Sequence, residues 1–204
     1  MLRKLFCIAV FTILGAGLTG CNKQVAGEAS CDFVQNGDLQ RVSWGASTPV
    51  TLYIDNNFPT AYYNSIHNAA SVWNKSIGRE VIKIGGVINT NGVPKQDGSN
   101  VIYYLPSWEP DRTYEQARTT VYWSSNRIFE ADVRVNGKDF SYTSGSTPAP
   151  GKVDMESLLV HEFGHVLGLV HTTESASVMV KSLPSNTLRR ALSNADNTDV
   201  KCEY

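Results

Sequence analysis

The feature that most constrains this chain is a run of histidines and glycines, His-Glu-Phe-Gly-His-Val-Leu-Gly-Leu-Val-His, at residues 161–171. His161 and His165 are four residues apart, so on a helix their rings project from one face and can reach a single ion. Gly168 can adopt the left-handed backbone conformation that ends a helix, after which the chain can bring His171 back to that ion. The spacing therefore predicts a three-histidine metal site.

The residue types in this motif indicate which metal it binds. Three neutral imidazoles suit zinc, and three protein ligands leave a fourth position open for water, which is typical of catalytic rather than structural zinc. Glu162 lies beside the first histidine and can act as a general base toward that water. Asp154 is a suitable N-cap for a helix that begins near Met155, which gives the motif its helical context. The sequence therefore predicts a hydrolase site with one catalytic zinc ion.

The motif also resembles a known family. His-Glu-x-x-His-x-x-Gly-x-x-His, followed by Met179 eight residues later, resembles the metzincin clan of zinc endopeptidases, and within it a small bacterial form of the matrixin family. The resemblance covers roughly residues 50–204. It implies an α+β fold with a twisted, mostly parallel sheet, an antiparallel edge strand, an active-site helix and a small C-terminal subdomain. It also implies that Gly168 and Met179 support the site, Met179 as an apolar floor beneath the histidines.

The same resemblance implies how a substrate is held. It places Val133 and Val135 on a sheet edge that borders the cleft, where an extended protein or peptide would pair as an added strand. Val180 and Leu183 would wall the pocket for a substrate side chain. We expect a monomeric zinc endopeptidase. Two alternatives stay open, a non-catalytic surface lipoprotein that binds zinc and a hydrolase of another amide or ester.

The N-terminal residues indicate export. Residues 1–20 have a basic start followed by an apolar run, Leu5 to Leu18, that is too short for a comfortable membrane span and is typical of a signal peptide. The run ends in Leu-Thr-Gly-Cys, which resembles the bacterial lipobox, in which Cys21 is lipidated. An ordinary signal peptide that is cleaved nearby is the alternative.

Lipidation of Cys21 would anchor the chain to the cell envelope through the polar tether 21–30. By resemblance to Gram-negative lipoproteins, Asn22 after the cysteine favours the outer membrane, if the organism has one. Residues 31–204 have the size of a single catalytic domain. A formal net charge of −1 gives no electrostatic reason to expect a nucleic-acid partner.

Two cysteines remain in the predicted domain, Cys31 and Cys202. An even number in an exported chain favours a disulfide between them. The alternative is that the Cys31 thiolate binds the zinc and holds the enzyme latent. The segment around Cys31 does not resemble the matrixin propeptide motif, so the disulfide is favoured.

Hydrophobic patterning predicts the remaining elements. We expect strands at 50–54, 81–84, 100–105, 118–123 and 128–135, a helix at 60–77 and helical segments at 188–192 and 196–202. The loop between Gly85 and Ser99 contains Asn89, Asn91 and Asp97, which are candidate Ca²⁺ ligands. Their spacing is not that of a helix–loop–helix calcium site, so an ordinary loop is favoured. Of four histidines only His67 lies outside the motif, so we expect no second zinc site.

Overall fold

The structure is a computed structural model that describes residues 31–204. The predicted signal peptide, the tether and the lipidation site Cys21 lie outside the described residues. Within residues 31–204, no helix combines the length and the apolar character that crossing a bilayer would require.

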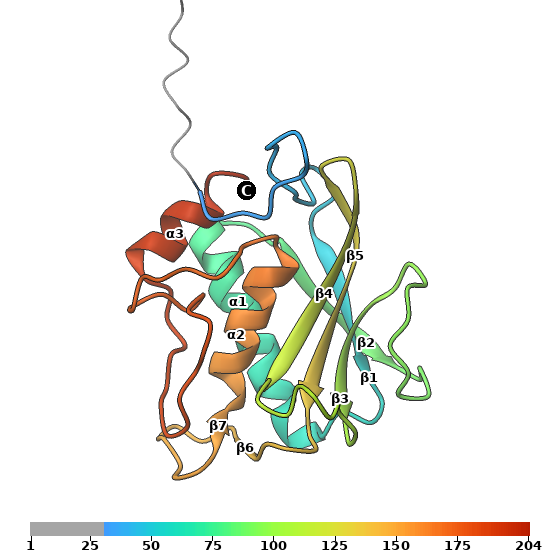
Figure 1. Cartoon of the computed structure of the whole chain (residues 1–204), viewed down its shortest axis with the longest axis vertical. Helices are drawn as coiled ribbons and strands as arrows, with labels where there is room; N and C mark the ends of the chain where they lie inside the picture. Colours follow the sequence, from blue (N-terminus) through green and yellow to red (C-terminus); the bar gives the residue numbers. More distant parts are fainter. Residues whose placement is uncertain (1–30) are drawn as a thin grey trace, which may run out of the picture. The chain divides into compact units, whose positions relative to one another are not determined.

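A five-stranded sheet forms the centre of the fold (Figure 1), in the order β2-β1-β3-β5-β4. The strands are β1 (Val50–Asp55), β2 (Ile82–Ile88), β3 (Asn100–Leu105), β4 (Ala117–Ser124) and β5 (Arg127–Asn136). All neighbouring pairs are parallel except β4 and β5, which form an antiparallel pair at the edge. The predicted α+β fold with a mostly parallel sheet and an antiparallel edge strand is confirmed.

The identity of the edge strand differs from the prediction. β4 is the edge, and β5 lies inside the sheet between β3 and β4. Val133 and Val135 are fully buried and belong to the core, so the prediction that they border the cleft is wrong. The physical reason is that β5 is buried on both faces along most of its length, as an interior strand must be, whereas β4 is only partly buried.

Two helices pack together on one face of the sheet, α1 (Tyr63–Ile77) and α2 (Met155–Val166). A short 3₁₀ turn, η1 (Thr60–Tyr62), precedes α1, and Gly78 ends it with a φ of 81°. The indole N–H of Trp73 in α1 donates to the Val160 carbonyl oxygen of α2 at 2.9 Å. Two short strands, β6 (Tyr142–Thr143) and β7 (Val153–Asp154), lead into α2, and α3 (Asn194–Val200) follows it. The predicted helix at 60–77 is confirmed.

Two boundaries in the second half of the prediction are wrong. Residues 188–192 are not helical. The Arg189 N–H donates to the Ser157 hydroxyl at 2.7 Å and Arg190 ion-pairs with Asp154, so contacts with the start of α2 hold this segment instead. α3 begins at Asn194, earlier than predicted, because Ser193 and Asp196 form a capping box.

The loop between β2 and β3 is shorter than predicted, because β2 continues to Ile88. The candidate calcium ligands in this loop close local turns. The Asn89 side-chain oxygen accepts from the Asn91 N–H at 3.1 Å, and Asp97 accepts from the Ser99 N–H at 3.0 Å. These contacts are those of an ordinary loop, and a calcium site there stays an untested prediction.

One buried carboxyl on the outer face of the sheet makes stability depend on pH. Asp132 is 2% exposed, and one carboxyl oxygen accepts from the Val101 N–H at 3.0 Å while the other has no partner. Burial, together with the charges of Glu130 and Asp97, raises the pKa of Asp132 from 3.8 to about 7, although the hydrogen bond from Val101 opposes the rise. The stability gained from protonated Asp132 is therefore complete below about pH 4 and is lost as the pH rises through about 7.

We therefore expect Asp132→Asn to gain stability over the parent as the pH rises. The difference in free energy of unfolding should grow between about pH 4 and pH 7 and stay level above it, at roughly 1–3 kcal/mol. Urea unfolding across this range measures it. The exposed Asp38→Asn serves as the control, and equal pH profiles for both variants would contradict the role of Asp132.

Candidate metal centre

Helix α2 and the turn after it position the three histidines. The Asp154 side chain caps α2 by accepting from the Ser157 N–H at 2.9 Å. The helix ends at Val166, and Gly168 then adopts a φ of 99°, which turns the chain toward His171. A Cβ at Gly168 would overlap the Val42 carbonyl oxygen. Glycine is therefore required here both for its backbone conformation and for the close approach of the N-terminal segment.

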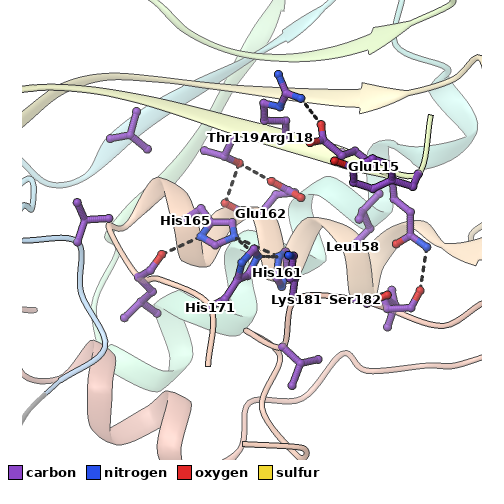
Figure 2. Close-up of a pocket in the computed structure, with 18 of the residues that line it drawn as sticks. Glu115, Arg118, Thr119, Leu158, His161, Glu162, His165, His171, Lys181 and Ser182 are labelled. Carbon is purple, nitrogen blue, oxygen red and sulfur yellow. Dashed lines mark hydrogen bonds and ion pairs between the residues drawn. The ribbon is translucent and has the colours of Figure 1, made fainter. Parts of the chain in front are cut away.

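The three rings meet as the sequence predicts (Figure 2). The Nε2 atom of His165 lies 3.1 Å from that of His161 and 3.1 Å from that of His171, and the remaining pair is 3.3 Å apart. Within residues 31–204, this is the one group of His, Cys, Asp or Glu side chains in which three ligand atoms lie close enough to share a metal ion. His67 is exposed on α1 and takes no part.

Backbone carbonyl groups fix which ring nitrogens face the centre. His161 Nδ1 lies 2.7 Å from the Val178 carbonyl oxygen, and His165 Nδ1 lies 2.7 Å from that of Leu169. Because a carbonyl oxygen only accepts, both Nδ1 atoms carry the hydrogen and both Nε2 atoms present a lone pair. Burial lowers the pKa of His161 and His165 to about 4, so both rings are neutral at neutral pH.

This donor set fits a zinc ion. Lone pairs that converge within 3.3 Å repel one another unless a cation lies between them. A tetrahedral zinc with Zn–N bonds of about 2.0–2.1 Å holds its nitrogen ligands roughly 3.3–3.4 Å apart, close to the spacing of the three Nε2 atoms. The carbonyl acceptors behind His161 and His165 supply the outer hydrogen bonds that orient metal-binding imidazoles.

Glu162 lies beside the centre, in contact with the edge strand. Glu162 is 4% exposed, and its carboxylate accepts from the Thr119 hydroxyl of β4 at 2.6 Å. Burial raises the pKa of Glu162, while the neighbouring His165 ring and the hydrogen bond from Thr119 oppose the rise. The sequence does not point to Thr119, because nothing in the local pattern distinguishes it from the other threonine of the strand. Its contact with Glu162 appears only in the folded structure.

We expect Thr119→Val to impair turnover by releasing the Glu162 carboxylate. A hydrogen bond to a charged group contributes about 1.5–3 kcal/mol, so kcat should fall roughly ten- to a hundredfold with KM nearly unchanged. Steady-state peptide cleavage measures both constants. Thr119→Ser should keep most activity, and Thr120→Val on the other face of β4 is the matched control. A Thr119→Val enzyme with parental kcat would exclude this role.

The segment after His171 supports the site from below. Met179 is buried, and a Cβ at Gly164 would overlap its sulfur atom, so Gly164 leaves the space that Met179 fills beneath α2. The Asp196 carboxylate of α3 accepts from the Ser177 hydroxyl and from the Val178 N–H. The Val178 carbonyl oxygen in turn accepts from His161 Nδ1, so Asp196 positions the His161 ring indirectly, through Val178. The position of Met179 after the histidine motif predicts its place beneath the site, whereas no local pattern points to the contacts of Gly164 or Asp196.

A cleft runs past the histidines along β4. Val180 and Leu183 line it, as expected, whereas Val133 and Val135 do not. The side-chain amide of Gln116 donates to the Leu183 carbonyl oxygen at 2.8 Å and so ties the two walls together near one end. Further lining residues come from the edge strand, α2 and the N-terminal segment, among them Val34, Thr119, Val121, Trp123, Leu158 and Lys181.

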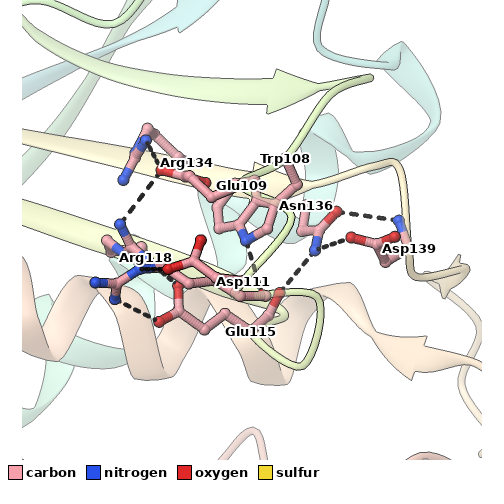
Figure 3. A network of polar contacts seen from close by, with 9 residues as sticks. Trp108, Glu109, Asp111, Glu115, Arg118, Arg134, Asn136 and Asp139 are labelled. Atoms are coloured by element: carbon pink, nitrogen blue, oxygen red, sulfur yellow. Dashed lines mark hydrogen bonds and ion pairs between the residues drawn. The ribbon is translucent and has the colours of Figure 1, made fainter.

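Behind this end of the cleft, a polar network holds the loop that joins β3 to β4 (Figure 3). The guanidinium groups of Arg118 and Arg134 lie over the Trp108 ring, 5.9 and 5.4 Å from its centroid. Arg118 also ion-pairs with Glu115, and Arg134 pairs with Glu109 at 3.0 Å. Because Glu115 and Arg118 also line the cleft, this network fixes the shape of its wall.

The Cys31 alternative is resolved by the structure. Cys31 and Cys202, 171 residues apart in sequence, form a disulfide. The Cys31 sulfur is therefore committed to Cys202 and is not a ligand for zinc.

Comparison with known proteins identifies the family. The sequence pattern of the Matrixin family matches residues 93–204, which is more than half of the chain and includes the metal centre. The chain belongs to the matrixin family of zinc endopeptidases. This matrixin is also similar to Metalloendoproteinase 1 of Glycine max, with 34% identity over 58 residues. That similarity covers 28% of this chain and 19% of the plant protein, so it extends over only a small part of either.

Proposed function

We propose that this matrixin is a zinc endopeptidase that cleaves extended protein or peptide chains at the cell envelope, where a lipid on Cys21 holds it. The observation that carries the proposal is the arrangement at the cleft: three Nε2 lone pairs converge beside the Glu162 carboxylate. A protein that only bound a partner would have no use for a buried base next to an open metal position.

The residues of the site divide the chemistry among them. His161, His165 and His171 would hold the zinc, which when bound acidifies a water molecule and stabilises negative charge on the substrate carbonyl oxygen. Glu162 accepts the proton of the attacking water and donates a proton to the leaving amine. Thr119 keeps the Glu162 carboxylate on the side of the edge strand, so the base stays oriented through both transfers.

The edge strand supports the preference for extended chains. β4 pairs with β5 on one side, and its other side borders the cleft. An extended peptide can add to such an edge through backbone hydrogen bonds, with little demand on its own sequence. Val180 and Leu183 form the wall of an apolar pocket for one substrate side chain. Substrate selectivity therefore depends on the residue whose side chain enters this pocket.

The envelope location rests on the sequence and on the disulfide. Leu-Thr-Gly-Cys at residues 18–21 predicts lipidation of Cys21. A disulfide between Cys31 and Cys202 suits an oxidising compartment outside the cytosol. Both features agree with export, and the short tether keeps the domain near the membrane.

Two measurements test the proposal. The purified, zinc-loaded protein should cut a complex peptide mixture within chains, and the new ends should share an apolar preference after the cut bond. Glu162→Gln in the same mixture is the control. Fractionation of cells should place the parent in the membrane and Cys21→Ser in the soluble fraction. Absence of new peptide ends would exclude the peptidase, and a soluble parent would exclude the anchor.

A further inference from the structure

The turn after helix α2 presents four successive backbone carbonyl oxygens, those of residues 166–169. An α-helix leaves its last carbonyl groups without partners inside the helix, so such groups need donors from elsewhere. The Leu169 oxygen is bonded by the His165 ring, and the Gly168 oxygen accepts from the Val34 N–H at 2.8 Å. The donors for the other two carbonyl groups come from side chains.

Trp44 and Tyr204 supply these two donors. The Trp44 indole N–H donates to the Val166 carbonyl oxygen at 2.7 Å, and the Tyr204 hydroxyl donates to that of Leu167 at 2.7 Å. The same hydroxyl accepts from the Trp44 backbone N–H at 3.2 Å, so the two residues also hold each other. They come from opposite ends of the described chain, which lie together above α2 in Figure 1. Burial raises the pKa of Tyr204, so its hydroxyl stays protonated and can donate.

His171 depends on this turn more than the other two metal ligands do. The rings of His161 and His165 are each held at Nδ1 by a backbone carbonyl oxygen. Within residues 31–204, the His171 ring has contacts at Nε2 with the other two histidines but no hydrogen-bond acceptor at Nδ1. Its place in the site therefore follows from the path of the backbone, which the turn sets on its N-terminal side.

We propose that Trp44 and Tyr204 are positioning residues for the zinc ion, because their donors hold the turn that delivers His171. The inference rests on the zinc site of the proposed peptidase. Without either donor, a carbonyl oxygen is left unpaired, and the peptide groups of the turn can rotate toward another partner. His171 and the Leu169 oxygen behind His165 would move with them, so the three Nε2 atoms would converge less closely.

Zinc affinity separates a positioning role from a merely structural one. A contact that stabilises the zinc-free and zinc-bound protein equally leaves the dissociation constant unchanged, whereas a contact that arranges the ligands lowers it. Tyr204→Phe removes one hydroxyl and keeps the ring. In the full-length protein we expect this variant to raise the zinc dissociation constant about tenfold, the low end of the change that follows loss of groups that orient metal-binding imidazoles. Trp44→Phe should act in the same direction. Competition with a chromophoric chelator measures both.

Tyr142→Phe is the matched control. It removes another phenol hydroxyl, which lies 2.8 and 2.9 Å from the carbonyl oxygens of Gln116 and Asn136, away from the turn. Zinc-free Tyr142→Phe and Tyr204→Phe should both unfold at lower urea concentration than the parent, but only Tyr204→Phe should bind zinc more weakly. Co²⁺ in place of zinc adds a spectroscopic check, because its visible absorption reports ligand geometry. The bands should shift in Tyr204→Phe and match the parent in Tyr142→Phe.

The outcomes distinguish this inference from the zinc site on which it rests. Parental zinc affinity and parental Co²⁺ bands in Tyr204→Phe would overturn the positioning role and leave the zinc site intact. Equal weakening of zinc binding by Tyr204→Phe and Tyr142→Phe would assign the effect to general stability and would overturn the role as well. A parent protein that binds no zinc would overturn the site itself.

Discussion

Glu162→Gln should lose most activity while keeping its zinc. Loss of a general acid–base group lowers kcat by about 10²- to 10⁴-fold. Glu162 contacts Thr119 and is not one of the three converging ligands, so metal content should stay at one zinc per chain. Cleavage of a fluorogenic peptide gives kcat, and elemental analysis of the same sample gives the zinc content.

Glu156→Gln is the matched control. Glu156 lies in the first turn of the same helix, and its carboxylate accepts a hydrogen bond from the Asn68 side chain outside the cleft. This variant should keep parental kcat. If Glu162→Gln retained full activity, Glu162 would not be the base. If it lost zinc together with activity, the carboxylate would belong to the metal-binding set instead.

Removing the disulfide should produce the largest change in stability. Cys31→Ser combined with Cys202→Ser should lower the free energy of unfolding by about 2–5 kcal/mol, since the cross-link constrains a very long loop of the unfolded chain. Guanidinium unfolding of the zinc-free protein measures this loss without a contribution from metal binding.

Reductant supplies the internal control for this prediction. A reducing agent should bring the parent close to the stability of the double variant and leave the double variant unchanged. Equal stability of the oxidised parent and the double variant would show that packing alone holds the two ends. A further effect follows at the metal centre, because the backbone carbonyl oxygen of Asp32 accepts from the Val170 N–H next to His171. We expect weaker zinc binding in the double variant.

The metal centre could be predicted from the sequence because its signal is local. His161, His165, Gly168 and His171 lie within eleven residues, and helical geometry alone brings the first two together. The cap at Asp154 and the glycine at the end of α1 follow equally local rules. The pairing of Cys31 with Cys202 could also be predicted from the sequence, because residues 31–204 contain no other cysteine.

The remaining features depend on contacts between distant segments. Thr119 reaches Glu162 across 43 residues, and Asp196 holds Val178 from a separate helix. The order of β4 and β5 in the sheet was misjudged for the same reason. The sequences of both segments are typical of strands. β5 pairs in parallel with β3, and this pairing places β5 inside the sheet and leaves β4 at the edge. Gly164 is needed only because Met179 packs against it.

A peptidase is exposed to its own activity, and the link between Cys31 and Cys202 bears on that exposure. It closes the domain into a covalent ring, so one nick in a surface loop would leave both pieces attached and packed. Self-digestion would need a second cut before any fragment could depart.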